Sequence, residues 1–248
     1  GWSSVEFVPE RPGIGRTPDL HVSRPRRRWA VECKRLMPSA YAAREKVHGT
    51  ALAKAVHELS SQLGRSIVVE VKYNIELSSV PDDYLVRCVT EALDRRSRMP
   101  WNDEVAAGRV RPVSWGLVHR VFAHDFVYYG SSRMIELLSG AYIHEADHSM
   151  AARWRPAPGR PFYADAVDQA SVVSWICLAK EAKNKKARHF KSILANAEGQ
   201  LPADRPGVVQ IGVESGSGAE IAAARHVRNI LEARPFAPTS SRLRWVYG

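Results

Sequence analysis

Cysteine is scarce in this chain of 248 residues, and long apolar stretches are absent. The three cysteines, Cys33, Cys88 and Cys177, are odd in number and fit no zinc-binding spacing. They indicate free thiols in a reducing compartment rather than a disulfide framework. No run approaches the roughly 18 uninterrupted apolar residues of a membrane span. The first residues, GWSSVEF, also lack the basic start and apolar run of a signal peptide. A cytoplasmic protein is therefore expected.

The chain also lacks internal repeats, low-complexity tracts, a glycine-rich phosphate loop and a recognition-helix motif. Its composition, with 45% hydrophobic and 25% charged residues, is that of a globular protein. The charge is strongly positive, at a formal +10. An excess of this size favours an anionic partner, and nucleic acid is the usual one.

Two clusters hold much of the positive charge. One is the arginine-rich segment SRPRRRW, and the other is a predicted basic helix over about residues 184–198. The residues of this helix expected to pack against the core are Ala187, Phe190, Ile193, Leu194 and Ala197. The outward charges of such a helix either form a solvated face or follow a phosphate backbone, and both interpretations stay open. The residues predicted to contact nucleic acid are Arg24, Arg26, Arg27, Arg28, Lys183, Lys185, Lys186 and Arg188.

The periodicity of apolar residues predicts alternating strands and helices, and hence an α/β or α+β protein. The expected strands cover residues 5–8, 18–23, 28–36, 66–73, 111–122, 172–179, 207–214 and 242–248. The expected helices cover residues 40–63, 81–95, 132–153, 184–198 and 218–233, and residues 153–162 are expected to form a loop or linker. The order up to residue 73 is therefore β-β-β-α-β.

One segment combines two acidic residues with a lysine on neighbouring strands. Asp19 follows Pro18 in the second predicted strand, and Glu32 and Lys34 lie in the third. Side chains alternate across a strand, so Glu32 and Lys34 share one face. If the two strands pair as a hairpin around the SRPRRR turn, Asp19 joins them on one patch. The opposite face of the third strand, expected to enter the core, carries Trp29, Val31 and Cys33.

Such a patch suits the hydrolysis of phosphodiester bonds. Two carboxylates offer the hard oxygen ligands that Mg²⁺ or Mn²⁺ prefers. The metal lowers the pKa of a bound water and stabilises the charge that grows on the phosphate. A neighbouring ammonium group can orient the attacking water and add further charge stabilisation. The alternative interpretation is a solvated hairpin face with a cross-strand ion pair.

Over roughly residues 1–75, the chain contains TPDLHV, a hairpin, WAVECKRL, an amphipathic helix and a strand, in this order. This arrangement resembles the PD-(D/E)xK, or restriction-endonuclease-like, nuclease superfamily. The resemblance implies a mixed sheet flanked by helices, with residues 1–78 as the nuclease core and residues 79–248 as an α/β extension or second domain. It implies Asp19 and Glu32 as metal ligands and Lys34 as the residue that assists the water, with Mg²⁺ or Mn²⁺ as cofactor. It favours DNA over RNA as substrate, and a role in bacterial defence or restriction; assembly as a homodimer or in a larger complex stays open.

Several further residues are candidates for the same site. The family core begins with a helix that sometimes supplies an acidic ligand; no such helix is evident here, so it lies upstream of Gly1 or the chain departs from the pattern. Glu6 and Glu10 are the nearby acids that could substitute. Gln62, near the end of the predicted helix, could reach the site. Glu70, in a second ExK on the next strand, is expected to be a polar residue on a sheet face.

Two other functions compete with the nuclease. The segment from His144 to His148 matches HExxH, which on a helix would place both histidines on one face for zinc, with Glu145 as base. Asp147 and the lack of a clear third ligand weaken this zinc-hydrolase hypothesis. The other alternative is a nucleic-acid-binding protein whose nuclease site has decayed.

Overall fold

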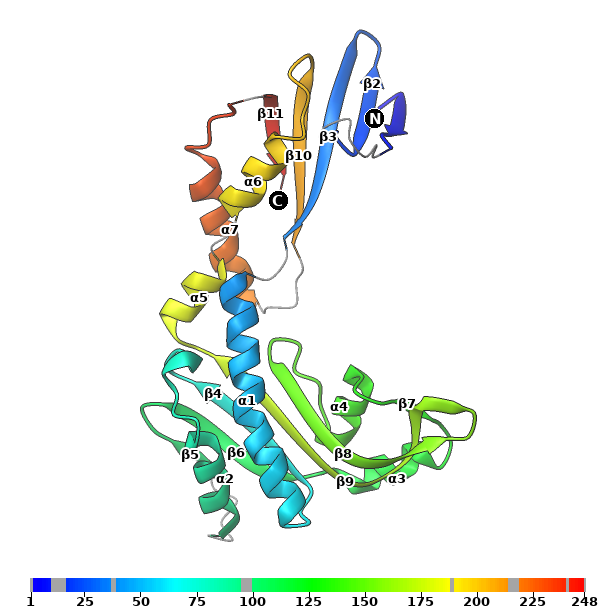
Figure 1. Cartoon of the computed structure of the whole chain (residues 1–248), viewed down its shortest axis with the longest axis vertical. Coiled ribbons are helices and arrows are strands. Elements are labelled where there is room, and N and C mark those ends of the chain that lie inside the picture. The colour runs from blue at the N-terminus through cyan, green and yellow to red at the C-terminus, as the bar shows by residue number, and fades with distance from the viewer. Residues whose placement is uncertain are drawn as a thin grey trace. The chain divides into compact units, whose positions relative to one another are not determined.

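The computed structural model describes residues 2–9, 17–36, 39–94, 100–187, 190–213, 219–239 and 241–247. The chain forms two compact units (Figure 1), and both are mixtures of helices and strands, which confirms the predicted α/β class. The first unit joins Gly1–Ser39 to Asn184–Gly248, and the second unit is Ala40–Lys183. The border expected at residue 78 therefore falls inside the second unit. No helix in the described part of the chain is long and apolar enough to cross a membrane.

The first unit is built on one mixed sheet with the strand order β1-β2-β3-β10-β11. The first three strands form an antiparallel meander, β10 runs parallel to β3, and β11 runs parallel to β10. The strands are β1 (Ser4–Phe7), β2 (Leu20–Arg24), β3 (Arg27–Leu36), β10 (Pro206–Val213) and β11 (Arg242–Tyr247). The helices of this unit are α6 (Phe190–Glu198) and α7 (Ala219–Ala233), and α5 (Lys180–Ala187) crosses the border between the units.

The two faces of this sheet are covered differently. One face packs against α6, where Ala30 and Ile211 of the sheet meet Phe190 and Leu194 of the helix. Of the predicted packing residues, Phe190, Leu194 and Ala197 are buried and Ile193 is partly buried, while the side chain of Ala187 lies outside the described part of the chain. The other face has a smaller cluster that consists of strand residues only, centred on Trp29.

The second unit contains a sheet with the order β5-β6-β4-β9-β7, and β8 pairs with β9 beside this path. Its strands are β4 (Ile67–Tyr73), β5 (Trp101–Asn102), β6 (Ala106–Pro112), β7 (Val127–Tyr128), β8 (Asp147–Ala157) and β9 (Arg160–Cys177). Its helices are α1 (Ala40–Gln62), η1 (Leu77–Ser79), α2 (Tyr84–Asp94), α3 (Trp115–Phe122) and α4 (Ser132–Ser139). Two apolar clusters fill it: α1 and α2 contribute to one, and α3 and α4 contribute to the other.

Three predicted elements of the second unit were wrong. Residues 111–122 were expected as a strand, but Trp115–Phe122 is a helix whose Trp115, Val118 and Phe122 pack into one cluster at helical spacing. The helix expected over 132–153 ends at Ser139, because Gly140 adopts a left-handed conformation (φ 77°) that caps it. The expected loop at 153–162 is instead the hairpin between β8 and β9.

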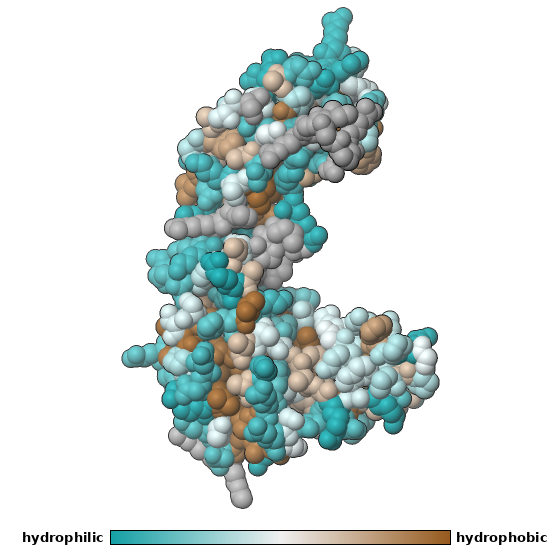
Figure 2. All heavy atoms as spheres, viewed as in Figure 1, coloured by the Kyte–Doolittle hydropathy of each residue, from teal (hydrophilic) through white to brown (hydrophobic). Residues whose placement is uncertain are grey.

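Hydrophobic residues reach the surface of both units between hydrophilic ones (Figure 2). In the first unit the exposed apolar residues include several aromatic side chains. They are Trp2, Phe7, Trp245 and Tyr247.

Gly49 of α1 is expected to resist replacement by alanine. A Cβ at this buried position would overlap the indole ring of Trp175, which is only 2% exposed. Alanine normally stabilises a helix interior by about 1 kcal/mol relative to glycine, but overpacking of a core costs about 1–3 kcal/mol. We therefore expect Gly49→Ala to lower the free energy of unfolding by about 1–2 kcal/mol in a urea titration. Gly116→Ala is the matched control, because the open position in α3 has no atom within 4 Å of the new Cβ. It should be neutral or mildly stabilising, and equal effects of both substitutions would contradict the clash.

Candidate functional site

The hairpin of β2 and β3 brings Asp19 and Glu32 together. Leu20 is paired with Val31 in antiparallel register, which places Asp19 opposite Glu32. The backbone N–H of Asp19 donates to Glu32 Oε2 at 3.2 Å, and the backbone N–H of Cys33 donates to Asp19 Oδ2 at 2.7 Å. The hairpin predicted from the sequence is thus present, and it positions both carboxylates through main-chain hydrogen bonds.

Glu32 is a fully buried carboxylate, and its cationic neighbour within the described residues is Lys34. Its exposed fraction is 0%, and the Lys34 ammonium lies 2.5 Å from its Oε1. Beyond this ion pair, no residue in the described ranges makes a well-aligned hydrogen bond to Oε1. Burial raises the pKa of the Glu32 carboxyl, the Lys34 contact lowers it, and the nearby Asp19 carboxylate raises it again, so that the net direction is upward. The site therefore holds more negative charge than its single ammonium compensates.

The donor set fits a hard divalent cation. Mg²⁺ keeps several waters and is commonly held by one or two carboxylates together with substrate phosphates. Asp19 and Glu32 supply two such carboxylates, and apart from the Lys34 ammonium the buried Glu32 Oε1 has no hydrogen-bond partner among the described residues. Within the described residues no group of three or more His, Cys, Asp or Glu side chains could hold a metal. Water and substrate oxygens would therefore complete the coordination.

The reactive groups of this site are two adjacent carboxylates and one ammonium on a rigid hairpin. Such a set can bind a divalent cation and hold a water molecule between carboxylate and ammonium. No protein-family model, curated protein or solved structure matches this chain. The chemistry of the residues themselves is therefore the basis for assigning a function.

One residue of the third strand does not lie where the sequence predicted. Cys33 was expected to enter the core with Trp29 and Val31, but its side chain is exposed. The apolar cluster on that face of the sheet contains Val31 and Val208, and it includes no residue from a described helix. Strand alternation correctly gave the direction of Cys33, but not whether another layer covers it.

The arginine-rich segment forms the turn of the hairpin. Pro25 and Arg26 connect β2 to β3, and Arg26 has a left-handed backbone (φ 67°). The Arg24 guanidinium lies 4.9 Å from the centre of the Trp2 ring. All four arginines predicted to bind nucleic acid here, Arg24, Arg26, Arg27 and Arg28, are exposed.

The second basic cluster is divided between two helices. Lys183, Lys185 and Lys186 lie on α5, with Lys185 exposed and the other two partly buried. Arg188 lies outside the described residues. The single basic helix expected over 184–198 is therefore α5 followed by α6.

Glu70 does not join the acidic pair. It lies on β4 in the second unit, where its carboxylate accepts hydrogen bonds from Arg109 Nε at 2.7 Å and Arg111 Nη2 at 2.6 Å. Burial alone would raise the pKa of Glu70, but the two guanidinium groups hold it below its ordinary range. This is the polar sheet residue that the sequence predicted.

The other candidates for this site were Gln62, Glu10 and Glu6. Gln62 is exposed at the end of α1 in the second unit. Glu10 lies outside the described residues. Glu6 pairs in register with His21 rather than with Asp19, and it lines a small polar pocket of about 170 Å³ in the first unit.

The HExxH segment is not helical, which removes the geometry on which the zinc hypothesis depended. Residues 144–146 precede β8, and His148 is the second residue of that strand. Both ring nitrogens of His148 are engaged, Nδ1 with Ser174 Oγ at 2.8 Å and Nε2 with the Ile143 carbonyl at 2.8 Å. Burial lowers the pKa of His148, so it stays neutral in this network. These two contacts connect the start of β8 to β9 and to the segment before β8.

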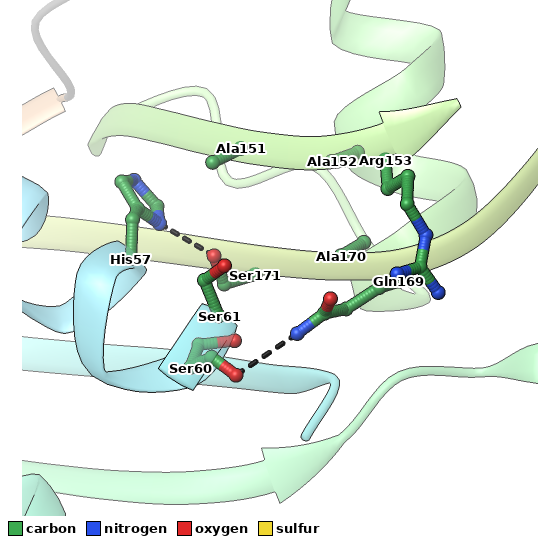
Figure 3. A pocket seen from close by; sticks show the side chains of 9 residues that line it. All are labelled: His57, Ser60, Ser61, Ala151, Ala152, Arg153, Gln169, Ala170 and Ser171. Carbon is green, nitrogen blue, oxygen red and sulfur yellow. Dashed lines mark hydrogen bonds between the residues drawn. The ribbon is translucent and has the colours of Figure 1, made fainter. Parts of the chain in front are cut away.

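A second histidine with an unusual environment lies in a pocket of about 390 Å³ between α1, β8 and β9 (Figure 3). His57 Nδ1 is 2.6 Å from Ser171 Oγ, and its Nε2 is 2.9 Å from Ser149 Oγ. Burial lowers the pKa of His57 to about 4, so the ring is neutral at physiological pH and a weak base. Sequence reasoning missed this pocket. The available signal for this pocket was a group of polar residues close together near the end of a helix that packs against the core. They are His57, Ser60 and Ser61.

Proposed function

We propose that this chain is a divalent-metal-dependent nuclease that hydrolyses phosphodiester bonds, with Asp19 and Glu32 as metal ligands and Lys34 as the residue that orients the water. The observation that carries the proposal is a buried carboxylate, Glu32, that pairs with the Lys34 ammonium, accepts a hydrogen bond from the backbone N–H of Asp19 and is close enough to the Asp19 carboxylate to be affected by its charge. DNA is the favoured substrate, by analogy with the PD-(D/E)xK superfamily, and a role in bacterial defence follows from the same analogy.

The order of elements in the first unit supports a restriction-endonuclease-like core. The resemblance implies β-β-β-α-β, and the first unit has this order in β1, β2, β3, α6 and β10, with β10 parallel to β3. The helix and strand that suggested this order in the sequence, α1 and β4, belong to the second unit, which is inserted after β3. The proposed nuclease core is therefore not the continuous segment of residues 1–78. It is the first unit, whose chain is interrupted after β3 by the whole second unit.

The residues of the hairpin have different roles in the proposed reaction. The chemistry that a bound Mg²⁺ or Mn²⁺ supplies is a lowered pKa of its water and stabilisation of charge on the phosphate. Asp19 and Glu32 hold this cation, and their positions are fixed by the main-chain hydrogen bonds between β2 and β3. Lys34, half-buried beside Glu32, donates to the attacking water and offsets the growing negative charge. Of the exposed arginines near the turn, Arg28 shares the face of Glu32 and Lys34 and can neutralise substrate phosphates on that face.

Asp19→Asn tests the proposal, because it keeps the size of the side chain but removes one ligand charge. Plasmid, linear duplex, single-stranded DNA and RNA are incubated with wild type and variant in Mg²⁺, Mn²⁺ or EDTA. We expect cleavage by the wild type with metal only, and a loss of about 10²–10³-fold in the variant. Asp204→Asn is the matched control, since Asp204 is an exposed carboxylate of the same unit paired with Arg205.

Three outcomes would contradict the proposal. Cleavage in EDTA would exclude the metal, and cleavage unaffected by Asp19→Asn would place the site elsewhere. Binding of nucleic acid by both proteins without any cleavage would identify the non-catalytic binding protein instead.

A further inference from the structure

One face of the sheet in the first unit presents aromatic side chains to solvent. The register of the strands places Phe7, Trp29, Trp245 and Tyr247 on the same face, opposite to the face that packs against α6. Phe7 is 85% exposed, Tyr247 58% and Trp245 49%. Trp245 stacks on Trp29 with ring centres 4.5 Å apart, and Trp2 lies 6.3 Å from Trp29 on its other side. We call this surface the aromatic face.

The charged residues of the aromatic face all have the same sign. Strand alternation and register place four exposed arginines on it: Arg24, Arg27, Arg35 and Arg242. No acidic residue lies on this face in the described strands. Glu6 of β1 and Glu32 of β3 lie on the opposite face, and Asp19, which directly precedes β2, lies opposite Glu32. The sheet therefore separates a cationic aromatic face from a face that carries its carboxylates.

We infer that the aromatic face binds single-stranded nucleic acid. Unpaired bases can stack on exposed aromatic rings, and arginines beside them can neutralise the phosphates. A sheet of four strands that stacks two or three bases on its aromatics is an established way to bind RNA. A duplex keeps its bases stacked internally and cannot use the rings in this way. The inference goes beyond the proposed nuclease, because the aromatic face lies on the side of the sheet opposite to Glu32 and Lys34, and binding to it does not require the acidic site to be active.

The charge pattern favours this occupant over a second copy of the chain. The chain has a net charge of +10, and two copies joined through the aromatic face would bring eight like-charged guanidinium groups together, four from each. A polyanion gains from the same charges by releasing counterions. The exposed rings then add contacts that depend on unpaired bases.

The test is the affinity for a labelled oligothymidine strand, measured by fluorescence anisotropy in EDTA so that cleavage does not interfere. Phe7→Ala and Tyr247→Ala remove exposed rings with little risk to folding, and each should weaken binding about tenfold. Arg242→Gln should lower the slope of log affinity against log salt by about 0.7. The matched controls are Tyr128→Ala and Arg120→Gln, an exposed ring and an exposed guanidinium of the second unit, which should change nothing.

The outcomes separate this inference from the proposed nuclease. Ring variants that bind the strand as tightly as wild type would overturn the inference, even if metal-dependent cleavage is present. Loss of binding in these variants supports it, even if no cleavage is found. The inference would also be overturned if the ring variants lost as much affinity for a duplex as for the single strand. A third contrary outcome is a dimer of the DNA-free protein that dissociates in Phe7→Ala while binding of the single strand persists.

Discussion

Glu32→Gln should abolish metal-dependent cleavage and at the same time stabilise the metal-free protein. Glutamine keeps the shape of the buried side chain but removes the charge that would hold the cation, so we expect cleavage to fall by about 10²–10⁴-fold. The carboxylate of Glu32 is fully buried, and a buried charge is costly unless it is well compensated. Removing it should raise the free energy of unfolding in EDTA by about 1–2 kcal/mol near neutral pH.

The direction of the pKa shift gives this prediction a pH dependence. The pKa of Glu32 is raised in the folded protein from its ordinary value of 4.5. The folded state therefore binds the proton more tightly than the unfolded state does. This contribution to stability is fully present below the ordinary pKa and is lost as the pH rises through the folded pKa. The stability advantage of Glu32→Gln should accordingly be small at about pH 4 and reach its full size near pH 8.

Urea unfolding at both pH values, in EDTA and in Mg²⁺, measures the effect. Mg²⁺ should stabilise the wild type but not Glu32→Gln, because a ligand stabilises only the state that binds it. Glu58→Gln is the control, since Glu58 is an exposed carboxylate of α1. If Glu32→Gln is less stable than the wild type in EDTA at pH 8, the Glu32 carboxylate stabilises the fold itself and is not a metal ligand that costs stability when no cation is bound.

The candidate site was predictable from the sequence because it depends on short-range geometry. Alternation along β3 places Glu32 and Lys34 on one face, and the tight turn at Pro25 and Arg26 is enough to bring Asp19 beside them. These contacts involve residues close in the sequence. Their direction follows from the period of a strand alone.

The division of the chain was not predictable in the same way. The sequence shows the order β-β-β-α-β twice over, once through α1 and β4 and once through α6 and β10. Only the pairing of β3 with β10, between residues far apart in the sequence, decides which helix and strand belong to the core. The exposed aromatic face depends on the same long-range pairing, because Trp245 meets Trp29 through β10 and β11.

Lys34→Ala should also abolish cleavage, but it should destabilise the protein where Glu32→Gln stabilises it. Without the ammonium, the buried Glu32 carboxylate loses its cationic neighbour. Breaking a fully buried pair costs about 3–5 kcal/mol; because Lys34 is 29% exposed and Glu32 can take up a proton, we expect about 2 kcal/mol near pH 8. The loss should shrink towards pH 5, since protonation of Glu32 removes the uncompensated charge. Cleavage should fall by about 10²–10³-fold.

Two companions of Lys34→Ala separate charge from chemistry. Lys34→Arg keeps a cation next to Glu32 and should recover most of the stability, but the planar guanidinium cannot replace the compact ammonium at the water, so cleavage should stay low. Adding Glu32→Gln to Lys34→Ala should remove the pH-dependent loss, because no buried charge is left to compensate. Lys54→Ala, which breaks an exposed pair with Glu58, should cost less than about 0.5 kcal/mol. If Lys34→Arg cleaves as fast as the wild type, Lys34 acts only as a positive charge that compensates Glu32, and the water is oriented by another group.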